Sequence, residues 1–255
     1  MDRFLQLSQA SLFLAALVWV NFSFAGNAID IVRAEGKITI SDTQEGQQNA
    51  VGLNGRLPSK VVLTTGSDGR AVIRVGNTGL LVVDKSSKIE INLANHAGFF
   101  RQVSGIIFYA INAIKDKSQV LEIKTQTATI GVRGTRFVIV DIPGRNEIGM
   151  QKGVLSVMSL NEEFEVHRQV ELDEFEKYKQ AGENALQVEK DGFDAFKQKS
   201  SQDFVTYKKE FTLGAERMVS FAGKRVDDLP LSAEARQNIA NLEIYARVWL
   251  DEIRD

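Results

Sequence analysis

The segment Gly131-Val132-Arg133-Gly134-Thr135-Arg136 has the residue types of an anion-binding loop, with two glycines flanking an arginine. It lacks the spacing of glycine, lysine and serine or threonine that defines a phosphate loop, and no helix is predicted to follow it. We therefore predict that the glycines form a tight turn or left-handed backbone between two strands. Arg133 would then be a buried hydrogen-bonding clamp or a solvent-facing residue. An anion contact by Arg133 and Arg136 is the alternative interpretation.

The residues that usually carry catalysis or bind metals are sparse. The chain has no cysteine, which excludes disulfides, thiol catalysis and cysteine-zinc sites. Its two histidines, His96 and His167, lie in different predicted regions, and one pair cannot complete a typical zinc site. There is no Gly-x-Ser-x-Gly elbow, and nothing in the sequence pairs two carboxylates in a pocket. We predict a non-enzymatic protein with no catalytic residue, no metal and no cofactor.

The pattern of the first half predicts a series of short strands. Apolar and polar residues alternate, as in Ile89–Leu93 and Leu121–Thr125. Glycine-containing turns separate the runs, for example Thr65–Gly69. The other predicted strands are 31–40, 60–65, 70–75, 80–83, 137–140 and 153–158. The run Ile106–Ile114 is apolar and fits either a strand or a buried helix. We predict an all-β unit over residues 26–160.

The order of these strands and turns resembles the FecR domain, a β-rich bacterial module found outside the cytoplasm. The most specific part is Thr125–Val140, with a core of Gly131, Arg133, Gly134, Thr135 and Phe137. Weaker matches are Ala34-Glu35-Gly36-Lys37-Ile38, Leu63-Thr64-Thr65-Gly66, the strands 71–75 and 80–83, and Lys152-Gly153-Val154. The resemblance covers about half of the chain. It implies a module of short stacked strands that serves in binding or as a scaffold. A solenoid is one arrangement that such strands could form.

The N-terminus predicts export. Signalling members of the FecR family are similar in having a cytoplasmic anti-sigma segment before a transmembrane helix. Here ten residues precede the apolar run Ser11–Phe24, so we expect no such segment and no direct contact with a sigma factor. Arg3, the run and Ser23-Phe24-Ala25 predict a signal peptide, residues 1–25, that is cleaved; an uncleaved anchor is the alternative. The run is short for a membrane span. We expect a periplasmic or secreted protein that meets the membrane during export alone.

Beyond Leu160 the pattern favours helices. A Phe-x-x-aromatic-Lys motif recurs after 18 residues (175 to 193) and after 11 (193 to 204), which are close to whole α-helical turns. We predict a long amphipathic helix from about 173 to 221. Its apolar stripe comprises Phe175, Tyr178, Phe193, Phe196, Phe204, Tyr207 and Phe211. The interpretations, in order of preference, are an intramolecular core, a coiled-coil-like surface for self-association or a partner helix, and a membrane-surface helix.

A second helix is predicted over residues 232–253. Ser232 is the expected N-cap, and Glu234 would lie in the first turn, near the positive end of the helix. The apolar residues at helical spacing are Ala235, Ile239, Leu242, Tyr245, Trp249 and Ile253. We expect this helix to pack antiparallel against the end of the long one. The predicted fold class is α+β, with a signal peptide, a β module over 26–160 and a helical region over 161–255.

The two halves of the mature chain carry opposite charge. Residues 26–160 contain 16 Lys and Arg against 11 Asp and Glu, a balance of +5. Residues 161–255 contain 14 against 21, a balance of −7. The halves could therefore dock on each other or on further copies of the chain. The positive charge is too diffuse to indicate nucleic acid.

We predict an exported binding or scaffold protein whose helical region mediates self-association or contact with a protein partner. The first alternative is an envelope signalling component that acts through a membrane partner. The second is a cell-wall or carbohydrate-active enzyme, which would need a cleft with converging carboxylates. Envelope polysaccharide is a further candidate ligand.

Overall fold

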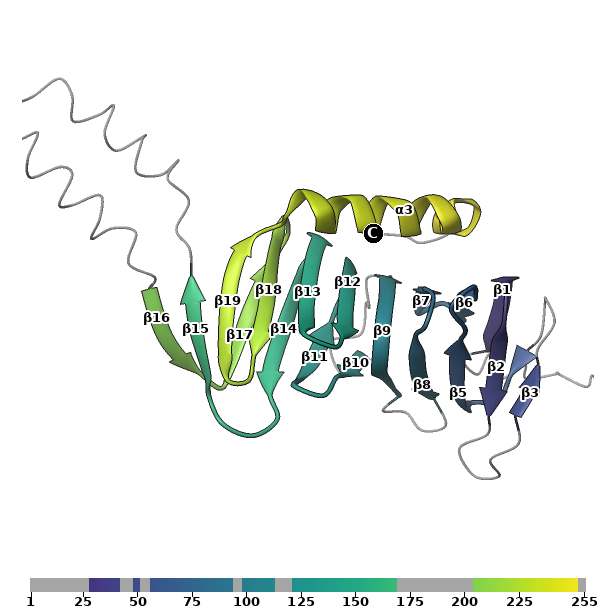
Figure 1. Ribbon diagram of the computed structural model, residues 1–255, viewed down its shortest axis with the longest axis horizontal. Coiled ribbons are helices and arrows are strands. Elements are labelled where there is room, and N and C mark those ends of the chain that lie inside the picture. The colour runs from purple at the N-terminus through teal and green to yellow at the C-terminus, as the bar shows by residue number, and fades with distance from the viewer. Residues whose placement is uncertain are drawn as a thin grey trace, which may run out of the picture.

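The computed structural model is an elongated sandwich of two β-sheets with one helix lying across it (Figure 1). It describes residues 28–41, 48–50, 56–93, 98–112, 121–168 and 204–251. The strands form a row along the long axis of the molecule, and the helix α3 (Ala233–Leu250) lies along one face of that row. The described residues therefore form a β-rich fold with a helical C-terminus.

Two sheets share one bent strand. Sheet A has the order β4 (Arg56–Leu57), β1 (Ile29–Glu35), β6 (Arg70–Val75), β7 (Gly79–Val83), β9 (Phe99–Ile111), β12 (Thr135–Ile142), β13 (Arg145–Lys152), β18 (Arg217–Ala222), β19 (Arg225–Pro230), β15 (Phe164–Arg168), β16 (Phe204–Lys208). Sheet B has the order β3 (Gln48–Ala50), β2 (Ile38–Ser41), β5 (Lys60–Thr65), β8 (Lys88–Asn92), β9, β10 (Leu121–Lys124), β11 (Ala128–Val132), β14 (Val154–Ser159), β17 (Glu210–Gly214). Neighbouring strands are antiparallel except for β9 with β10 and β15 with β19, which are parallel.

The predicted strands of the first half are confirmed, except that the run 31–40 is two strands, β1 and β2, which are separated at Gly36 (φ +63°) and lie in different sheets. The alternating runs became β8 and β10, and the turn at Thr65–Gly69 joins β5 to β6. The ambiguous run Ile106–Ile114 is a strand as far as Ile111, because it forms the second part of β9. The strands are stacked in two facing sheets that share β9. Strand β13, residues 145–152, which forms a hairpin with β12, was not among the predictions.

The two sheets differ in how many of their faces are buried. Sheet B has alternating burial, as in β5 and β8, because its inner face meets sheet A and its outer face is not covered by α3. Sheet A is buried on both faces in its middle, where Leu80 and Phe108 pack under α3 while their chain neighbours face sheet B. Strands buried on both faces need continuous apolar sequence. This is why β7 and the second part of β9 show no alternation.

The chain passes between the sheets at corners, and those of the N-terminal half lie side by side. We call residues 36–37, 66–69, 84–87 and 105–106 the corner row. The Gly66 N–H donates to the Lys37 carbonyl at 2.8 Å, and the Asp84 N–H donates to the Ile106 carbonyl at 3.0 Å. Gly105 has φ +96°, and a Cβ there would lie 2.4 Å from the Ser87 Cα. Glycine is therefore required where β9 crosses from sheet B to sheet A.

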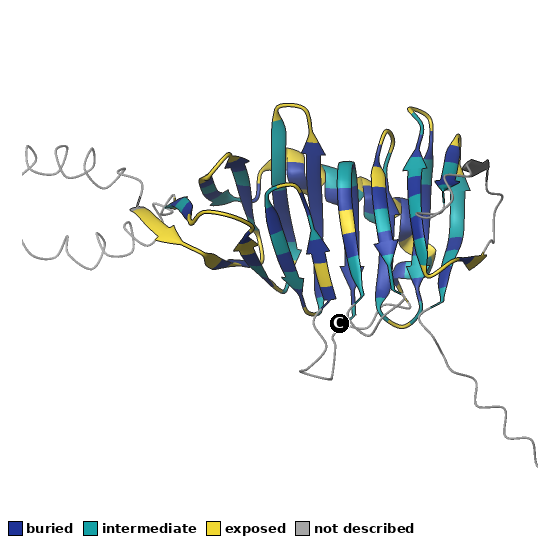
Figure 2. Cartoon of the chain, turned by 90° about the horizontal axis from the view of Figure 1, so that it is seen from below, coloured by how far each residue is buried: buried dark blue, intermediate teal, exposed yellow. Residues whose placement is uncertain are grey.

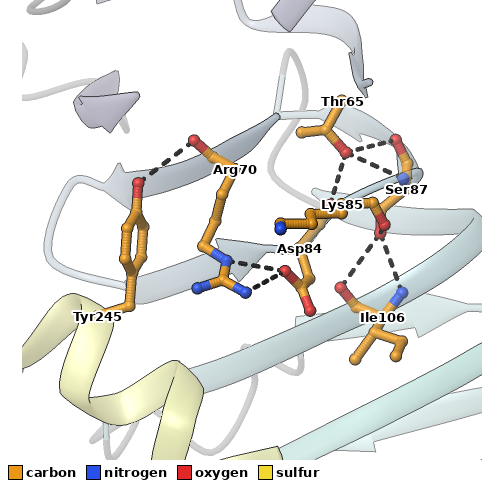
Figure 3. Close-up of polar contacts among 7 residues, drawn as sticks. All are labelled: Thr65, Arg70, Asp84, Lys85, Ser87, Ile106 and Tyr245. Carbon is orange, nitrogen blue, oxygen red and sulfur yellow. Dashed lines mark hydrogen bonds and ion pairs between the residues drawn. The ribbon is translucent and has the colours of Figure 1, made fainter. Parts of the chain in front are cut away.

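Two hydroxyls hold the corner row together (Figure 3). Thr65 Oγ1 donates to the Asp84 carbonyl at 2.6 Å and accepts from the Ser87 N–H at 2.9 Å. Ser87 is fully buried, and its Oγ accepts from the Ile106 N–H at 3.0 Å. These bonds satisfy backbone groups that the turns would otherwise leave unpaired in the interior. The corner row is thus closed by side chains as well as by the backbone.

The corners of the C-terminal half lie on the other side of the sandwich. In the pairing of β12 with β9, Asp141 is opposite Gly105 and Thr135 is opposite Ile111. The start of β12 is therefore about 20 Å from the corner row, at about 3.4 Å per residue. Here Gly134 (φ +64°) joins β11 to β12, and Gly153 (φ +94°) joins β13 to β14. The two corners touch, since a Cβ on Gly153 would lie 2.6 Å from the Gly134 carbonyl oxygen.

The long helix predicted over 173–221 is wrong for its last part. Residues 204–221 form β16, β17 and most of β18. The remainder of that prediction, residues 173–203, lies outside the described residues. β17 pairs with β14 and β18 with β13, so the strands of the second half extend the two sheets of the first. The physical reason is tertiary: β17 and β18 each find an unpaired strand edge to join, which outweighs the local helical spacing.

The predicted C-terminal helix is confirmed as α3. Ser232 is its N-cap and accepts from the Ala235 N–H at 3.1 Å, and Glu234 lies in the first turn. The expected packing against a second helix is wrong, because α3 buries Ile239 and Leu242 against sheet A. No helix in the described part of the chain has both the length and the apolar character needed to cross a bilayer.

The C-terminal half of α3 is fixed to the N-terminal strands through Tyr245. The Arg33 guanidinium lies 3.9 Å from the centre of its ring, and that of Arg70 lies 4.9 Å away. Arg33 also donates to the Tyr245 carbonyl at 2.8 Å, and Arg70 pairs with Asp84 at 2.6 Å (Figure 3). These contacts connect the end of the chain to β1, β6 and the corner row.

Candidate binding surface

The motif residues form the corner between β11 and β12. Gly131 lies within β11, between Glu122 and Ser156 of the neighbouring strands. Arg133 is exposed at the corner itself, and Gly134 adopts the left-handed conformation. Thr135 and Phe137 follow in β12, both buried. Phe137 stacks on Tyr109 with ring centres 5.0 Å apart, in the core between the sheets. Burial raises the pKa of Tyr109, whose hydroxyl donates to Gln102 at 3.0 Å.

The predicted aromatic stripe does not form a helix face where it is described. Phe204 and Tyr207 lie on β16, and Phe211 lies on β17. Tyr207 is 64% exposed, whereas Phe211 is buried and meets the Phe164 ring edge-on at 5.6 Å. Phe175, Tyr178, Phe193 and Phe196 lie outside the described residues. Within the described part, the stripe is thus divided between a surface residue and a core residue.

One end of the sandwich is built from a bent hairpin. The pairing of β14 with β17 continues, beyond a bend near Lys209, as the pairing of β15 with β16. Among the described strands, β16 is in register with β15 and β17 with β14, each on one side, so residues 204–214 form an edge, which we call the open edge. Figure 2 shows β16 at the left end of the molecule, where its residues 205–208 are all exposed. Val205 is 42% exposed, beside the still more exposed Tyr207.

The bend creates a cleft between the two sheets at this end. The cleft has a volume of about 580 Å³ and is lined by β14, β15, β16, β17, β18 and β19. Val166, Phe211 and Leu213 supply its buried apolar lining. Gly214 lies at the lining with nothing within 4 Å of the position of its missing Cβ. We call this space the end cleft.

Three cations and one carboxylate line the end cleft: Arg168, Lys208, Arg217 and Asp228. Arg217 Nε lies 2.7 Å from Asp228 Oδ1, and its Nη2 donates to the Asp228 carbonyl at 3.1 Å. Arg168 Nε lies 3.5 Å from the other carboxylate oxygen, Oδ2. The side chain of Asp228 is 12% exposed and that of Arg217 is 19% exposed, whereas that of Arg168 is 62% exposed. The lining carries a formal surplus of two positive charges.

A second hollow lies beside the first on the outer face of sheet B. It has a volume of about 490 Å³ and shares Val154 and Thr212 with the end cleft. The motif residues Gly131 and Arg133 line it, whereas Phe211 of the stripe lines the end cleft on the opposite face of β17. We call it the face hollow. The two hollows lie on either side of β17.

The face hollow also contains two carboxylates, Glu122 and Glu210. Both are exposed; Glu122 lies 3.6 Å from Lys124 Nζ, and Glu210 accepts from the Ser156 hydroxyl. A carboxyl that acts as a general acid is usually buried, since desolvation keeps it protonated near neutral pH. The arrangement of these two side chains does not provide that environment. Within the described residues, no group of three or more His, Cys, Asp or Glu side chains is placed to hold a metal.

The ladder of β14 and β17 shows which backbone groups face the open edge. The Ser159 N–H donates to the Lys209 carbonyl at 2.9 Å. In an antiparallel ladder, hydrogen-bonded and non-hydrogen-bonded pairs alternate. The backbone groups of Phe211 and Leu213 therefore point to β14, and those of Thr212 point to the free side. An extended chain placed there would find a donor and an acceptor at Thr212.

Several residues of this surface were missed in the sequence. Four strands that pair in the order β18, β19, β15, β16 bring together Arg217, Asp228, Arg168 and Lys208, and one of these pairings, β19 with β15, joins segments about 60 residues apart. The available signal was the strand-forming composition of Phe204-Val205-Thr206-Tyr207 and the Gly-Lys turn at 223–224. Of the histidines, His167 contacts Glu165 Oε1 at 2.9 Å on β15, and His96 lies outside the described residues.

Comparisons with known proteins find similarity to two solved structures and to one family model. Two crystal structures of a candidate anti-sigma factor from Parabacteroides distasonis are similar, with TM-scores of 0.45 and 0.46 and identities of 7% and 8%. They cover 69% and 71% of this chain, which spans 62% and 64% of theirs. We infer neither fold nor function from them. No curated protein matches the chain.

The family model described as FecR protein matches residues 61–156, from β5 to the middle of β14. These residues include the corner row from Gly66 onward and the motif at Gly131–Phe137. Residues 61–156 of this chain therefore match a FecR domain.

Proposed function

We propose that this chain is a non-enzymatic binding module that takes an extended segment of a protein partner along its open edge. The observation that carries the proposal is the edge 204–214, which pairs on one side among the described strands and exposes Val205 and Tyr207 on the face of β16 opposite the end cleft. Exposed strand edges add further strands readily, and proteins normally protect them. Strand addition provides affinity through backbone hydrogen bonds and specificity through alternate side-chain pockets.

A site-specific photocrosslinker tests this proposal in cells of the native organism. It replaces Tyr207 on the open edge, and the matched control replaces Ile244, which is 69% exposed on α3. We expect a discrete adduct from position 207 that position 244 does not give. Thr212→Pro, added to the first variant, should abolish the adduct because proline removes the donor that faces the free side. Identical adducts from both positions, or none from 207, would overturn the proposal.

Self-association is the alternative use of the same edge. Two copies could pair β16 with β16, and the predicted stripe residue Phe204 starts that strand. Size-exclusion chromatography with light scattering, on wild type and on Phe204→Ser and Thr212→Pro, distinguishes the two. A dimer that both variants dissociate would favour self-association. If the wild type is a monomer, the result would favour binding of a different protein at the open edge.

We also propose that residues 1–25 direct export and are removed, leaving a periplasmic or secreted protein. The proposal is supported by the sequence of that segment, which ends in Ser23-Phe24-Ala25. N-terminal sequencing of protein recovered from the envelope fraction should begin at Gly26. A protein that retains Met1 and stays with the cytoplasm would contradict it.

A second candidate function is that of an envelope signalling component that acts through a membrane partner. The match of residues 61–156 to the FecR family favours it. Deletion of the gene should then alter transcription of envelope genes, and wild type should restore it where Thr212→Pro does not. Unchanged transcription in the deletion strain would dismiss this function. Binding of envelope polysaccharide stays a prediction.

A further inference from the structure

The end cleft determines which side chains a partner strand could present. An extended segment beside β17 would place alternate side chains on opposite faces, since the period of a strand is two residues. One set would face outward, next to Thr212 and the face hollow. The other set would enter the end cleft, next to Phe211 and Leu213, which point inward from β17. The residues that line the cleft would therefore contact every second side chain of the segment.

The apolar part of the cleft favours an apolar side chain. Val166, Phe211 and Leu213 are buried and line an open volume of about 580 Å³ between the sheets, which leaves room for a further side chain. Burial of an aliphatic side chain there would remove apolar surface from water on both partners. One inward position of the segment is thus expected to be apolar.

The charged part of the cleft favours an anion at a neighbouring inward position. Arg217 is engaged twice by Asp228 and is mostly buried, so it is already neutralised. Arg168 has one longer contact to the same carboxylate, and Lys208 is exposed on the adjacent strand β16. A carboxylate between Arg168 and Lys208 would balance the surplus of positive charge, with the charge-assisted hydrogen bonds that guanidinium groups form.

We propose that the end cleft recognises an acidic segment in which an Asp or Glu lies two residues from an apolar residue, both on the face that enters the cleft. This proposal rests on the proposed function, because it specifies the partner segment that the open edge takes. The carboxylate that enters the cleft belongs to a side chain within the partner and is not the partner's C-terminal carboxylate. Arg168 and Lys208 contact the acid, and Phe211 with Val166 contacts the apolar residue.

Selection of short random peptides against the full chain, displayed without a free C-terminus, tests the proposal. Enriched peptides should share the apolar-x-acidic pattern. A selected peptide, synthesised with an amidated C-terminus, should bind the double variant Arg168→Gln, Lys208→Gln on the order of tenfold more weakly than wild type. Lys85→Gln with Lys88→Gln, which removes the same charge at the corner row, should leave the affinity unchanged. Replacing the acid of the peptide by its amide should cause the same loss in wild type and no further loss in the double variant.

Each outcome separates the inference from the proposed function. Peptides that lose binding with Thr212→Pro but bind the double variant as tightly as wild type would overturn the acidic segment alone. Binding that needs a free peptide C-terminus would show that the recognised carboxylate is the terminal one, and would overturn a side-chain carboxylate. Failure to enrich any peptide, or binding that Thr212→Pro does not alter, would overturn both proposals.

Discussion

The corner row and the open edge differ in whether the edges of their strands are paired. Each of the strands β5, β6, β7 and β8 next to the corner row pairs on both sides, and Thr65 and Ser87 satisfy the backbone between them. On the open edge, β16 and β17 pair on one side among the described strands, and Tyr207 is exposed. A fold that satisfies its polar groups so fully in one region needs a reason to leave an apolar edge uncovered in another. We infer that the corner row serves stability and the open edge serves binding.

The largest difference in stability between the two regions is expected when one glycine in each is replaced by alanine. Gly105→Ala should lower the free energy of unfolding by about 3 kcal/mol or more, because its φ of +96° is strained for alanine and its Cβ would overlap Ser87. Gly214→Ala should leave stability unchanged or raise it by a few tenths of a kcal/mol, since nothing lies within 4 Å. Urea unfolding of both variants measures the difference.

Gly144→Ala separates backbone strain from overlap. Gly144 has φ +78° but nothing within 4 Å of its Cβ position, so its variant should lose about 1 to 2 kcal/mol. If Gly105→Ala loses no more than Gly144→Ala, the corner row tolerates rearrangement and is not the rigid region that we infer.

A smaller difference in stability is expected between alanine variants of Ser87, in the corner row, and Ser156, in the face hollow. Ser87→Ala removes the acceptor of the Ile106 N–H in a fully buried corner, so it should cost about 2 kcal/mol. Ser156→Ala, in the face hollow, removes a hydroxyl that contacts the exposed Glu210, and it should change stability by less than about 0.5 kcal/mol. Thermal unfolding of the pair checks this. Equal losses would mean that the face hollow is as tightly organised as the corner row.

The strands near the corner row could be predicted because their burial leaves a direct trace in sequence. Sheet B has one covered face, and β8 and β10 alternate accordingly. The second part of β9 was ambiguous because α3, more than a hundred residues later in the chain, covers its other face. Continuous apolar sequence identifies burial on both faces but does not distinguish a strand from a helix.

The open edge could not be predicted, because its sequence also fits a helix. The spacing of Phe193, Phe204 and Phe211 matches whole helical turns, yet Phe204 and Phe211 lie on two strands separated by the bend at Lys209. The spacing therefore combined residues of two different strands. The charges of the end cleft were missed for a related reason: Arg168 and Asp228 meet through the parallel pairing of β15 with β19, and sequence separation gives no sign of it.

A further comparison concerns the two ends of α3. Tyr245→Leu keeps an apolar side chain but removes the ring between Arg33 and Arg70, and it should cost about 1 kcal/mol. Tyr245→Phe keeps the ring and should lie within a few tenths of a kcal/mol of wild type. At the other end, Glu234→Gln weakens an exposed ion pair with Arg145, and its effect should be similarly small. A loss from Glu234→Gln as large as that from Tyr245→Leu would show that the corner row does not anchor the helix preferentially.

The smallest effect on stability is expected next to the corner row, at Asp141, and it depends on pH. Asp141 lies opposite Gly105 and is 8% exposed, and its Oδ2 has no hydrogen-bond partner among the described residues. Burial raises the pKa of Asp141. The folded state therefore holds this proton more tightly than the unfolded state, so its contribution to stability is present below the ordinary Asp pKa and is lost as pH rises through the folded pKa. Asp141→Asn removes this dependence. The difference in unfolding free energy between Asp141→Asn and wild type should rise with pH across that acid range and then level off. A difference that stays constant with pH would mean that the carboxylate is solvated, and that the closure of the corner row does not extend to β12.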